Sequence, residues 1–205
     1  MKKNKLWLWL SLGSLFFPAL AGHALPDVPP VVTHILDTSK EIRTLTCHFT
    51  EKKKIALLAD TSVSHGQMYY RKSRCMRWEY TDPNPFYGIT NAEGSVMFRA
   101  GKVDKVGTKV FAQISRLILD LINGQPIDEK IFTTVYQKTS LGHQLTLIPQ
   151  MRKLKTSLDA LILSFDLETY TIRTIEFRQG ADVTRLELTH IRMNEPLDEK
   201  LFRWK

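Results

Sequence analysis

The chain has 205 residues, of which 43% are hydrophobic and 24% are charged, and its formal net charge is +8. This length is within the range of a single domain with a substantial hydrophobic core. The mildly basic charge favours anionic partners, such as lipid head groups or an acidic protein surface, and is too small to indicate a nucleic-acid-binding protein.

A secretory signal peptide is predicted at residues 1–21. Three lysines among the first five residues precede the apolar run 6–17, which is followed by Pro18 and small residues. This is the order of regions in a cleavable leader, and the run is shorter than the roughly 20 residues that span a bilayer. Cleavage is expected after Ala21 or, alternatively, after Ala24, and an uncleaved membrane anchor is the competing interpretation.

Cleavage after Ala21 would leave a mature protein of residues 22–205, predicted to be a single periplasmic domain. Its formal charge would be +5, because Lys2, Lys3 and Lys5 are the only charges removed. No cysteine stands directly after either cleavage position, so the mature protein is not expected to carry a lipid of its own.

The mature chain begins with a predicted helix and continues mostly as strands. Apolar residues recur at helical spacing over residues 27–44, and again over about 108–123, where Asn123, Gly124 and Pro126 provide a stop signal. Elsewhere the apolar residues alternate with period two, which is typical of strands covered on one side. Consecutive strands with short connections and separate helices predict an α+β fold with a curved antiparallel sheet.

The first predicted strand contains a cysteine and is followed by three lysines, and each feature has two interpretations. Cys47 alternates with Leu45 and Phe49. It is therefore either a small buried residue or one half of a disulfide with Cys75. Lysines 52–54 follow, and they are either a docking patch for an anionic partner or the charged end of a strand.

A hairpin is predicted at residues 66–85, with residues 73–75 as its connection, so that Tyr70 faces Trp78 and Met68 faces Tyr80. Met68, Tyr70, Met76, Trp78 and Tyr80 then share one face, with Lys72 as its only charge. These bulky, adaptable side chains suit a pocket for flexible apolar ligands. The alternative is that they fill an ordinary core.

Lys72 also has two interpretations. It is either a cation at the rim of the pocket that attracts a head group, or a surface lysine whose stem covers apolar area.

Several short motifs occur in the order found in outer-membrane lipoprotein carrier (LolA) proteins, and together they cover roughly residues 31–204. They are Phe49-Thr50-Glu51-Lys52, Gly66-x-Met68-x-Tyr70, Met76-Arg77-Trp78-Glu79-Tyr80 with Pro83, Ile89-x-Asn91-x-Glu93-Gly94, Leu145-x-Leu147-x-Pro149 and Ile172-x-x-Ile175-x-Phe177. The sequence therefore resembles that family.

The resemblance implies an incomplete, unclosed β-barrel with helices as a lid over an apolar cavity. It also implies a monomeric periplasmic carrier that takes lipoproteins from an inner-membrane ATP-driven release complex to an outer-membrane acceptor. The expected cavity residues are Phe49, Met68, Tyr70, Met76, Trp78 and Tyr80, and the expected lid and rim residues are Lys72, Phe111, Ile114, Leu117 and Ile118. In the family a basic residue followed by proline helps to hold the lid shut, and the matching dipeptide here is Lys72-Ser73.

Two other classes of function compete with the carrier. An enzyme is disfavoured, because the sequence has no His-x-x-x-His, Cys-x-x-Cys, Gly-x-Ser-x-Gly or glycine-rich phosphate loop, so no catalytic residue, metal or cofactor is predicted. A periplasmic protein that senses lipids or lipoproteins for regulation would share the same pocket, as would a carrier of another lipid.

Overall fold

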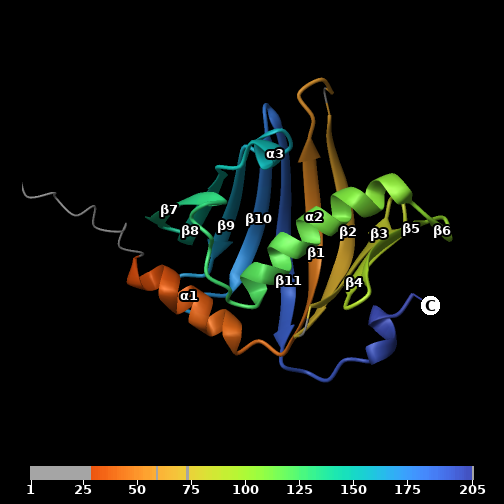
Figure 1. Cartoon of the computed structure of the whole chain (residues 1–205), viewed down its shortest axis with the longest axis horizontal. Coiled ribbons are helices and arrows are strands. Elements are labelled where there is room, and N and C mark those ends of the chain that lie inside the picture. Colours follow the sequence, from red (N-terminus) through yellow and green to blue (C-terminus); the bar gives the residue numbers. More distant parts are fainter. Residues whose placement is uncertain (1–28, 59, 73, 205) are drawn as a thin grey trace, which may run out of the picture.

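The computed structural model describes residues 29–58, 60–72 and 74–204, so the predicted signal peptide lies outside the described residues. One curved sheet has α2 crossing its inner face, α1 at one end and α3 at the other (Figure 1). The elements are α1 (Pro30–Lys40), β1 (Thr44–Lys54), β2 (Thr61–Arg71), β3 (Cys75–Asp82), β4 (Phe86–Asn91), β5 (Gly94–Arg99), β6 (Lys102–Val103), α2 (Lys105–Ile122), β7 (Phe132–Thr139), β8 (Gly142–Pro149), α3 (Arg152–Lys155), β9 (Ala160–Phe165), β10 (Ile172–Gln179), β11 (Asp182–Met193) and the 3₁₀-helix η1 (Glu199–Phe202).

The strands form a single antiparallel sheet in the order β6-β5-β4-β3-β2-β1-β11-β10-β9-β8-β7. Neighbouring strands are consecutive in the chain except at the centre, where β1 pairs with β11. β6 and β7 are the two edge strands and do not pair with each other, so the barrel is unclosed. The predicted α+β fold with an incomplete barrel is confirmed.

Both predicted helices are present, with shifted ends. α1 begins at Pro30. Proline is favoured in the first turn, because the backbone N–H groups there have no hydrogen-bond partner within the helix and the missing N–H of proline costs nothing. α2 begins three residues earlier than the periodicity predicted, because Asp104 caps it by accepting a hydrogen bond from the backbone N–H of Gly107 at 2.8 Å. It ends before Gly124, whose φ of +63° is readily adopted only by residues such as glycine.

The predicted register of the β2–β3 hairpin is wrong by two residues. Met68 pairs with Trp78, Tyr70 with Met76, and Arg71 with Cys75, so the connection is residues 72–74. A shift between His65 and Gly66 adds an irregularity further along the pair. Because the difference is an even number of residues, the predicted face is unchanged.

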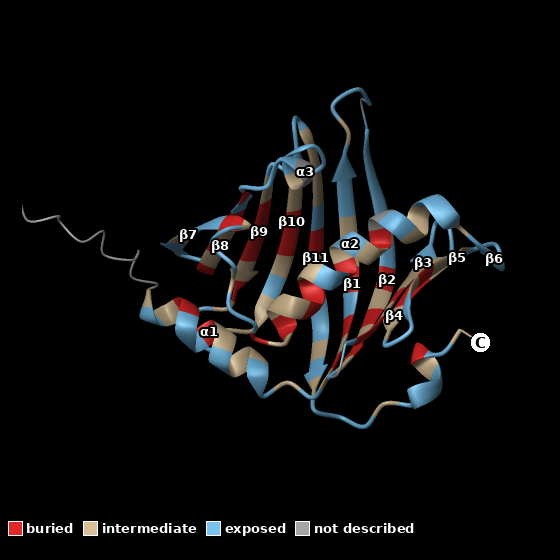
Figure 2. Ribbon diagram, in the orientation of Figure 1, coloured by how far each residue is buried: buried red, intermediate tan, exposed pale blue. Residues whose placement is uncertain are grey.

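The core lies between the inner face of the sheet and the helices, where buried positions alternate with exposed ones along the strands (Figure 2). Cys47 is on this inner face, between the buried residues Leu45 and Phe49. Cys75 is on the outer face, because its neighbour Met76 points inward. The two cysteines are therefore on opposite sides of the sheet and both are free.

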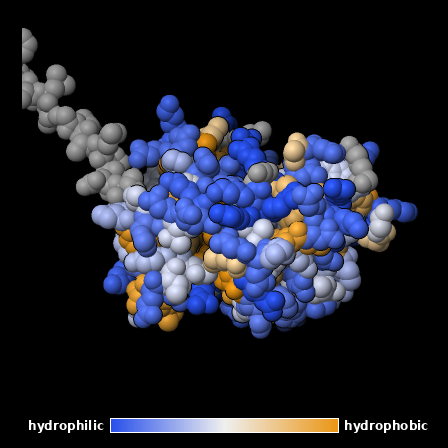
Figure 3. All heavy atoms as spheres, turned by 90° about the horizontal axis from the view of Figure 1, so that it is seen from below, coloured by the Kyte–Doolittle hydropathy of each residue, from blue (hydrophilic) through white to orange (hydrophobic). Residues whose placement is uncertain are grey.

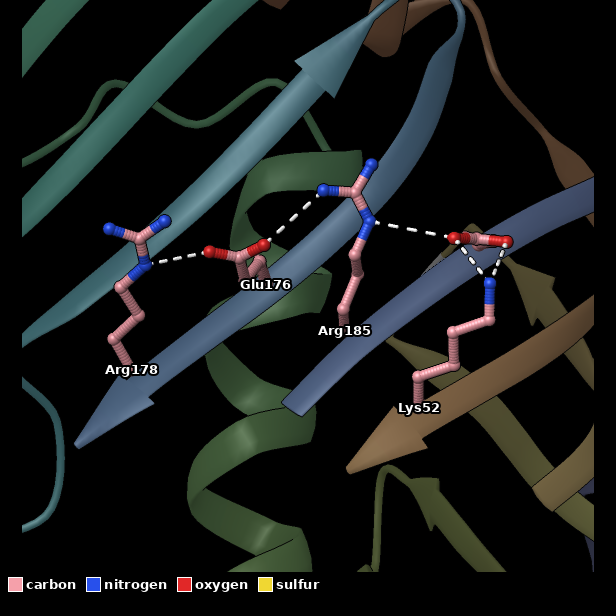
Figure 4. A network of polar contacts seen from close by, with 5 residues as sticks. Lys52, Glu176, Arg178 and Arg185 are labelled. Atoms are coloured by element: carbon pink, nitrogen blue, oxygen red, sulfur yellow. Dashed lines mark hydrogen bonds and ion pairs between the residues drawn. The ribbon is translucent and has the colours of Figure 1, made fainter. Parts of the chain in front are cut away.

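A row of charges crosses the outer face of β10, β11 and β1 (Figure 4). The Glu176 carboxylate is 2.7 Å from Arg178 and 3.3 Å from Arg185. Arg185 also approaches Glu187 at 3.6 Å, and Glu187 pairs with Lys52 at 3.1 Å. Glu176 is the buried member of the row, since its side chain is only 10% exposed.

Replacing Glu176 with glutamine is expected to lower the free energy of unfolding by about 1 kcal/mol, because two charge-assisted hydrogen bonds to a shielded carboxylate are weakened while the arginines stay half exposed. The matched change Glu187→Gln, at a side chain that is 38% exposed, should cost less than about 0.5 kcal/mol. Urea denaturation of both variants measures the difference. Equal losses would show that burial of Glu176 adds nothing.

Candidate functional site: an apolar hollow under the helices

A hollow of about 650 Å³ lies between the inner face of the sheet and the helices α2 and α3. It extends across the strands, from Met97 and Arg99 on β5 to Phe177 on β10. Its size is within the range of about 300–1,000 Å³ that is usual for ligand pockets. The lining is mostly apolar, so the hollow suits a hydrocarbon chain better than a polar metabolite.

Aromatic rings form the floor of the hollow. Tyr80 stacks on Phe86 with ring centroids 4.1 Å apart. Phe49 does not itself line the hollow, and it supports the floor by contacting Tyr80 at 4.9 Å and Trp78 at 5.5 Å. Phe49 can occupy this position because Gly66 has no side chain: a Cβ there would lie 2.4 Å from Phe49 Cζ. The floor is thus a continuous, polarizable surface.

The roof is the inward face of α2, which presents Phe111, Ile114 and Leu117 to the hollow. The ring of Phe111 sits against the backbone of Gly88, the cross-strand partner of Trp78. A Cβ on Gly88 would be 2.6 Å from Phe111 Cζ, so only glycine leaves room for this contact. Phe111 therefore seats the helix on β4.

Hydrogen bonds attach α2 to the sheet near its start, in its middle and at its end. Near its start, Thr108 Oγ1 accepts from the backbone N–H of Met97 at 2.9 Å. In its middle, Ser115 Oγ is 2.9 Å from Thr90 Oγ1. At its end, the Tyr70 hydroxyl donates to Asn123 Oδ1 at 2.8 Å. The roof is fixed along β4 and β5 and at its last turn.

The β2–β3 connection contacts both helices. The Lys72 ammonium donates to the backbone oxygen of Lys40, at the end of α1, at 2.5 Å. The Arg74 guanidinium is 3.6 Å from the Asp120 carboxylate on α2. Two cations from one connection therefore hold the helix ends, which also approach each other where Gly124 packs against Leu36.

One end of the hollow is polar. Glu51 and Lys53 follow Phe49 on the inward side of β1, and Asp182 and Thr184 stand at the adjacent start of β11. The Tyr80 hydroxyl donates to Glu51 Oε2 at 2.6 Å. The hollow thus grades from an aromatic floor to a charged mouth.

Stability should depend on alkaline pH through Tyr80. Burial, and then the Glu51 carboxylate, raise the Tyr80 pKa above its usual 10.0. Above about pH 10 the unfolded chain loses this proton and the folded chain keeps it, so stability is complete below that pH and falls above it, by up to about 1.4 kcal/mol per pH unit. Urea unfolding should show a shallower alkaline loss for Tyr80→Phe, and identical slopes would contradict the assignment.

Trp78 carries an unusual polar atom in the wall of the hollow. Its side chain is 6% exposed, and its Nε1 has no hydrogen-bond partner among the described residues. A buried donor left without a partner costs about 1–3 kcal/mol. A ligand that brings an acceptor to this atom would recover that cost.

The expected site residues occupy three different places. Trp78, Tyr80, Phe111, Ile114 and Leu117 line the hollow, whereas Lys72 lies outside it at the helix ends. The remaining predicted residues are packed in the core beside the hollow: Phe49, Met68, Tyr70, Met76 and Ile118.

One side of the hollow comes from the second half of the chain and was not predicted from the sequence. Leu158, Phe177 and Leu186 complete the apolar wall. The strands of Phe177 and Leu186 were predicted, whereas Leu158 lies between α3 and β9. No local pattern shows that β11 pairs with β1 across the chain. Glu51 and Lys53 could have been predicted to face inward, because they are the next alternate positions on β1 after Phe49.

The described part of the chain holds no cluster of three or more His, Cys, Asp or Glu side chains that could bind a metal ion. Within those same residues, no helix is both long and apolar enough to cross a membrane.

Comparison with known proteins identifies the family of the chain. The model of the family described as "Outer membrane lipoprotein carrier protein LolA" matches residues 40–205, which include every strand and all of α2. The chain belongs to the LolA family. A search of the curated proteins finds no match.

Solved structures with a similar fold have little sequence identity to this LolA-family chain. A LolA superfamily protein from Nitrosomonas europaea is 10% identical with a TM-score of 0.46, covering 84% of this chain and 97% of that one. Mycobacterium tuberculosis lipoprotein LppX is 13% identical with a TM-score of 0.47, covering 83% and 99%. The Pseudomonas aeruginosa MucA/MucB complex gives 9% identity and a TM-score of 0.48, covering 85% and 61%.

Proposed function

We propose that the protein is a periplasmic carrier that binds the acyl chains of lipoproteins in the hollow and moves them from the inner to the outer membrane. The observation that carries the proposal is an apolar hollow of about 650 Å³ with an aromatic floor and a helical roof. Family membership makes lipoproteins the first choice of cargo. The partners implied are an inner-membrane ATP-driven release complex and an outer-membrane acceptor.

A carrier needs a hydrophobic site that does not hold its ligand too tightly. Removing a chain of about 16 carbons from water is worth roughly 13 kcal/mol at about 0.8 kcal/mol per CH₂. Full coverage would make release very slow. A roof that must be displaced lowers the net affinity, because the ligand supplies the energy of opening.

The contacts of α2 supply that opening cost. Phe111 must leave its contact with Gly88, and the Tyr70–Asn123 hydrogen bond and the ion pair of Arg74 hold the end of α2. Lys72 holds the end of α1, which approaches the end of α2. In this proposal Lys72 acts as a latch through its charge, although it lacks the planar fork of an arginine. Once the roof moves, the carbonyl of an acyl ester or amide can accept from Trp78 Nε1.

Displacement of a fluorescent acyl probe tests the proposal. A synthetic peptide with an N-terminal triacylated cysteine should displace the probe from the purified protein, whereas the same peptide without acyl chains should not. Failure to take up the probe would refute acyl binding. Displacement by phospholipid but not by the lipopeptide would keep the hollow as a lipid site and exclude lipoproteins as its cargo.

A further inference from the structure

Two leucines are exposed to solvent at the connection between β1 and β2. Leu57 is 95% exposed and Leu58 is 58% exposed, and the backbone N–H of Leu58 donates to the oxygen of Ile55 at 2.9 Å, which turns the chain. Ile55 and Ala56 separate them from the lysines 52–54. We call residues 52–58 the tip. In Figure 1 the β1–β2 hairpin rises above the rest of the sheet, so the tip projects from the molecule.

The tip itself carries three lysines and no acidic residue. Lys53 and Lys54 are exposed, while Lys52 pairs with Glu187 at 3.1 Å. Of the nearby acids, Asp182 accepts from the backbone N–H of Ala56 at 2.7 Å, and Asp60 is exposed. The tip therefore presents two leucines beside two lysines that face solvent.

The same end of the sheet carries a second, smaller element of this kind. α3 lies at the same upper end of the sheet in Figure 1 and contributes Arg152 and Lys155, and the preceding residue Met151 is 48% exposed. By contrast, the face seen from below is largely hydrophilic, with small separate hydrophobic patches (Figure 3). Leu57, Leu58 and Met151 are thus exposed apolar residues that lie next to basic ones at this end of the sheet.

We propose that the tip docks on an anionic lipid bilayer, with Leu57 and Leu58 entering the boundary between head groups and acyl chains and Lys53 and Lys54 lying among the phosphates. Apolar side chains combined with lysines are the chemistry that binds such an interface. An exposed pair of leucines on a projecting loop fits a fluid bilayer, because it offers no broad, shaped surface of the kind that a stable protein interface needs.

The position of the hollow indicates a role for the docking in transfer of an acyl chain. This role rests on the proposed function. Lys53 belongs to the tip and also lines the polar mouth of the hollow, together with Glu51 and Asp182. A tip seated in a bilayer would hold that mouth at the membrane surface. An acyl chain could then pass between bilayer and hollow with little exposure to water.

Vesicle flotation tests the docking without any cargo. A chain that begins at Gly22 keeps every described helix and strand and removes the apolar leader, which would bind lipid by itself. This protein should float with vesicles of phosphatidylethanolamine and phosphatidylglycerol, and should float poorly with pure phosphatidylcholine or at high salt. Leu57→Ser/Leu58→Ser should lower the partition coefficient by about tenfold or more. Lys53→Gln/Lys54→Gln should lower it by about fivefold for each lysine.

Leu141 supplies the matched control. It is 91% exposed in the β7–β8 connection, close to Lys138 and away from the tip. Leu141→Ser should leave flotation unchanged, and all variants should keep the wild-type melting temperature because the altered side chains are in solvent.

An environment-sensitive dye on Leu57→Cys should shift to the blue when the anionic vesicles are added, which reports entry into the bilayer rather than adsorption. Equal flotation of wild type and both tip variants, or no dye shift, would overturn the proposal. Probe displacement by lipopeptide is measured without vesicles, so failure of the carrier proposal would be seen separately.

Discussion

Two carboxylates placed in the roof of the hollow, in Ile114→Glu/Leu117→Glu, are expected to abolish binding of an acyl probe while the protein stays folded. Both side chains line the hollow and are only partly buried, so in the empty protein the new carboxylates can reach water. A bound acyl chain would enclose them. Burying an unpaired charge costs several kcal/mol, so the dissociation constant should rise on the order of 100-fold or more.

The control is a charge change on the opposite side of the same helix. Arg116 is exposed and does not line the hollow, so Arg116→Glu should bind the probe like the wild type. Fluorescence titration of the three proteins, with melting curves to establish folding, measures the effect. Normal binding by the double variant would place the acyl site somewhere other than beneath α2.

Adding a methyl group at Gly88 is expected to loosen the roof. In Gly88→Ala the new Cβ would lie 2.6–2.7 Å from three atoms of the Phe111 ring, so the ring must leave its seat and take α2 with it. Overpacking of this kind costs about 1–3 kcal/mol, against a gain of up to about 1 kcal/mol from the lower backbone entropy of alanine. We expect a net loss of about 1–2 kcal/mol in stability and faster uptake of the acyl probe.

The double variant Gly88→Ala/Phe111→Leu distinguishes this contact from a general weakening of β4. The smaller leucine leaves room for the methyl group, so the double variant should lose less stability than the sum of the two single losses. Urea denaturation gives the three free energies, and stopped-flow fluorescence gives the uptake rates. Additive losses with an unchanged uptake rate would mean that Phe111 does not hold the roof closed.

Sequence periodicity was sufficient for the antiparallel character of the sheet and for both long helices, but it did not identify β6 or β7. The inward face of the β2–β3 hairpin was predicted correctly even though its register was wrong, because side chains alternate with period two and the error was two residues. α3 was not predicted, since four residues are too few to show a helical period. The β1–β11 pairing joins residues far apart in the chain, and no local pattern encodes it.

The sequence did not indicate where along the strands the hollow lies. Met68, Tyr70 and Met76 share the apolar character and the face of Trp78 and Tyr80, yet only the latter two line the hollow. The difference is set by the α2 helix, whose last turn packs over Tyr70 through Asn123. Alternation reports which side of a sheet a residue faces, and it carries no information about what covers that side at each point.

Mass spectrometry of the lipid that co-purifies with the protein from the periplasm, under mild conditions, is the most direct test of acyl carriage in the hollow. We expect acylated lipoprotein, or free acyl lipid derived from it, with the wild type and with Arg116→Glu, and none with Ile114→Glu/Leu117→Glu. The same lipid yield from all three proteins, or no acyl lipid from the wild type, would contradict the hollow as the binding site.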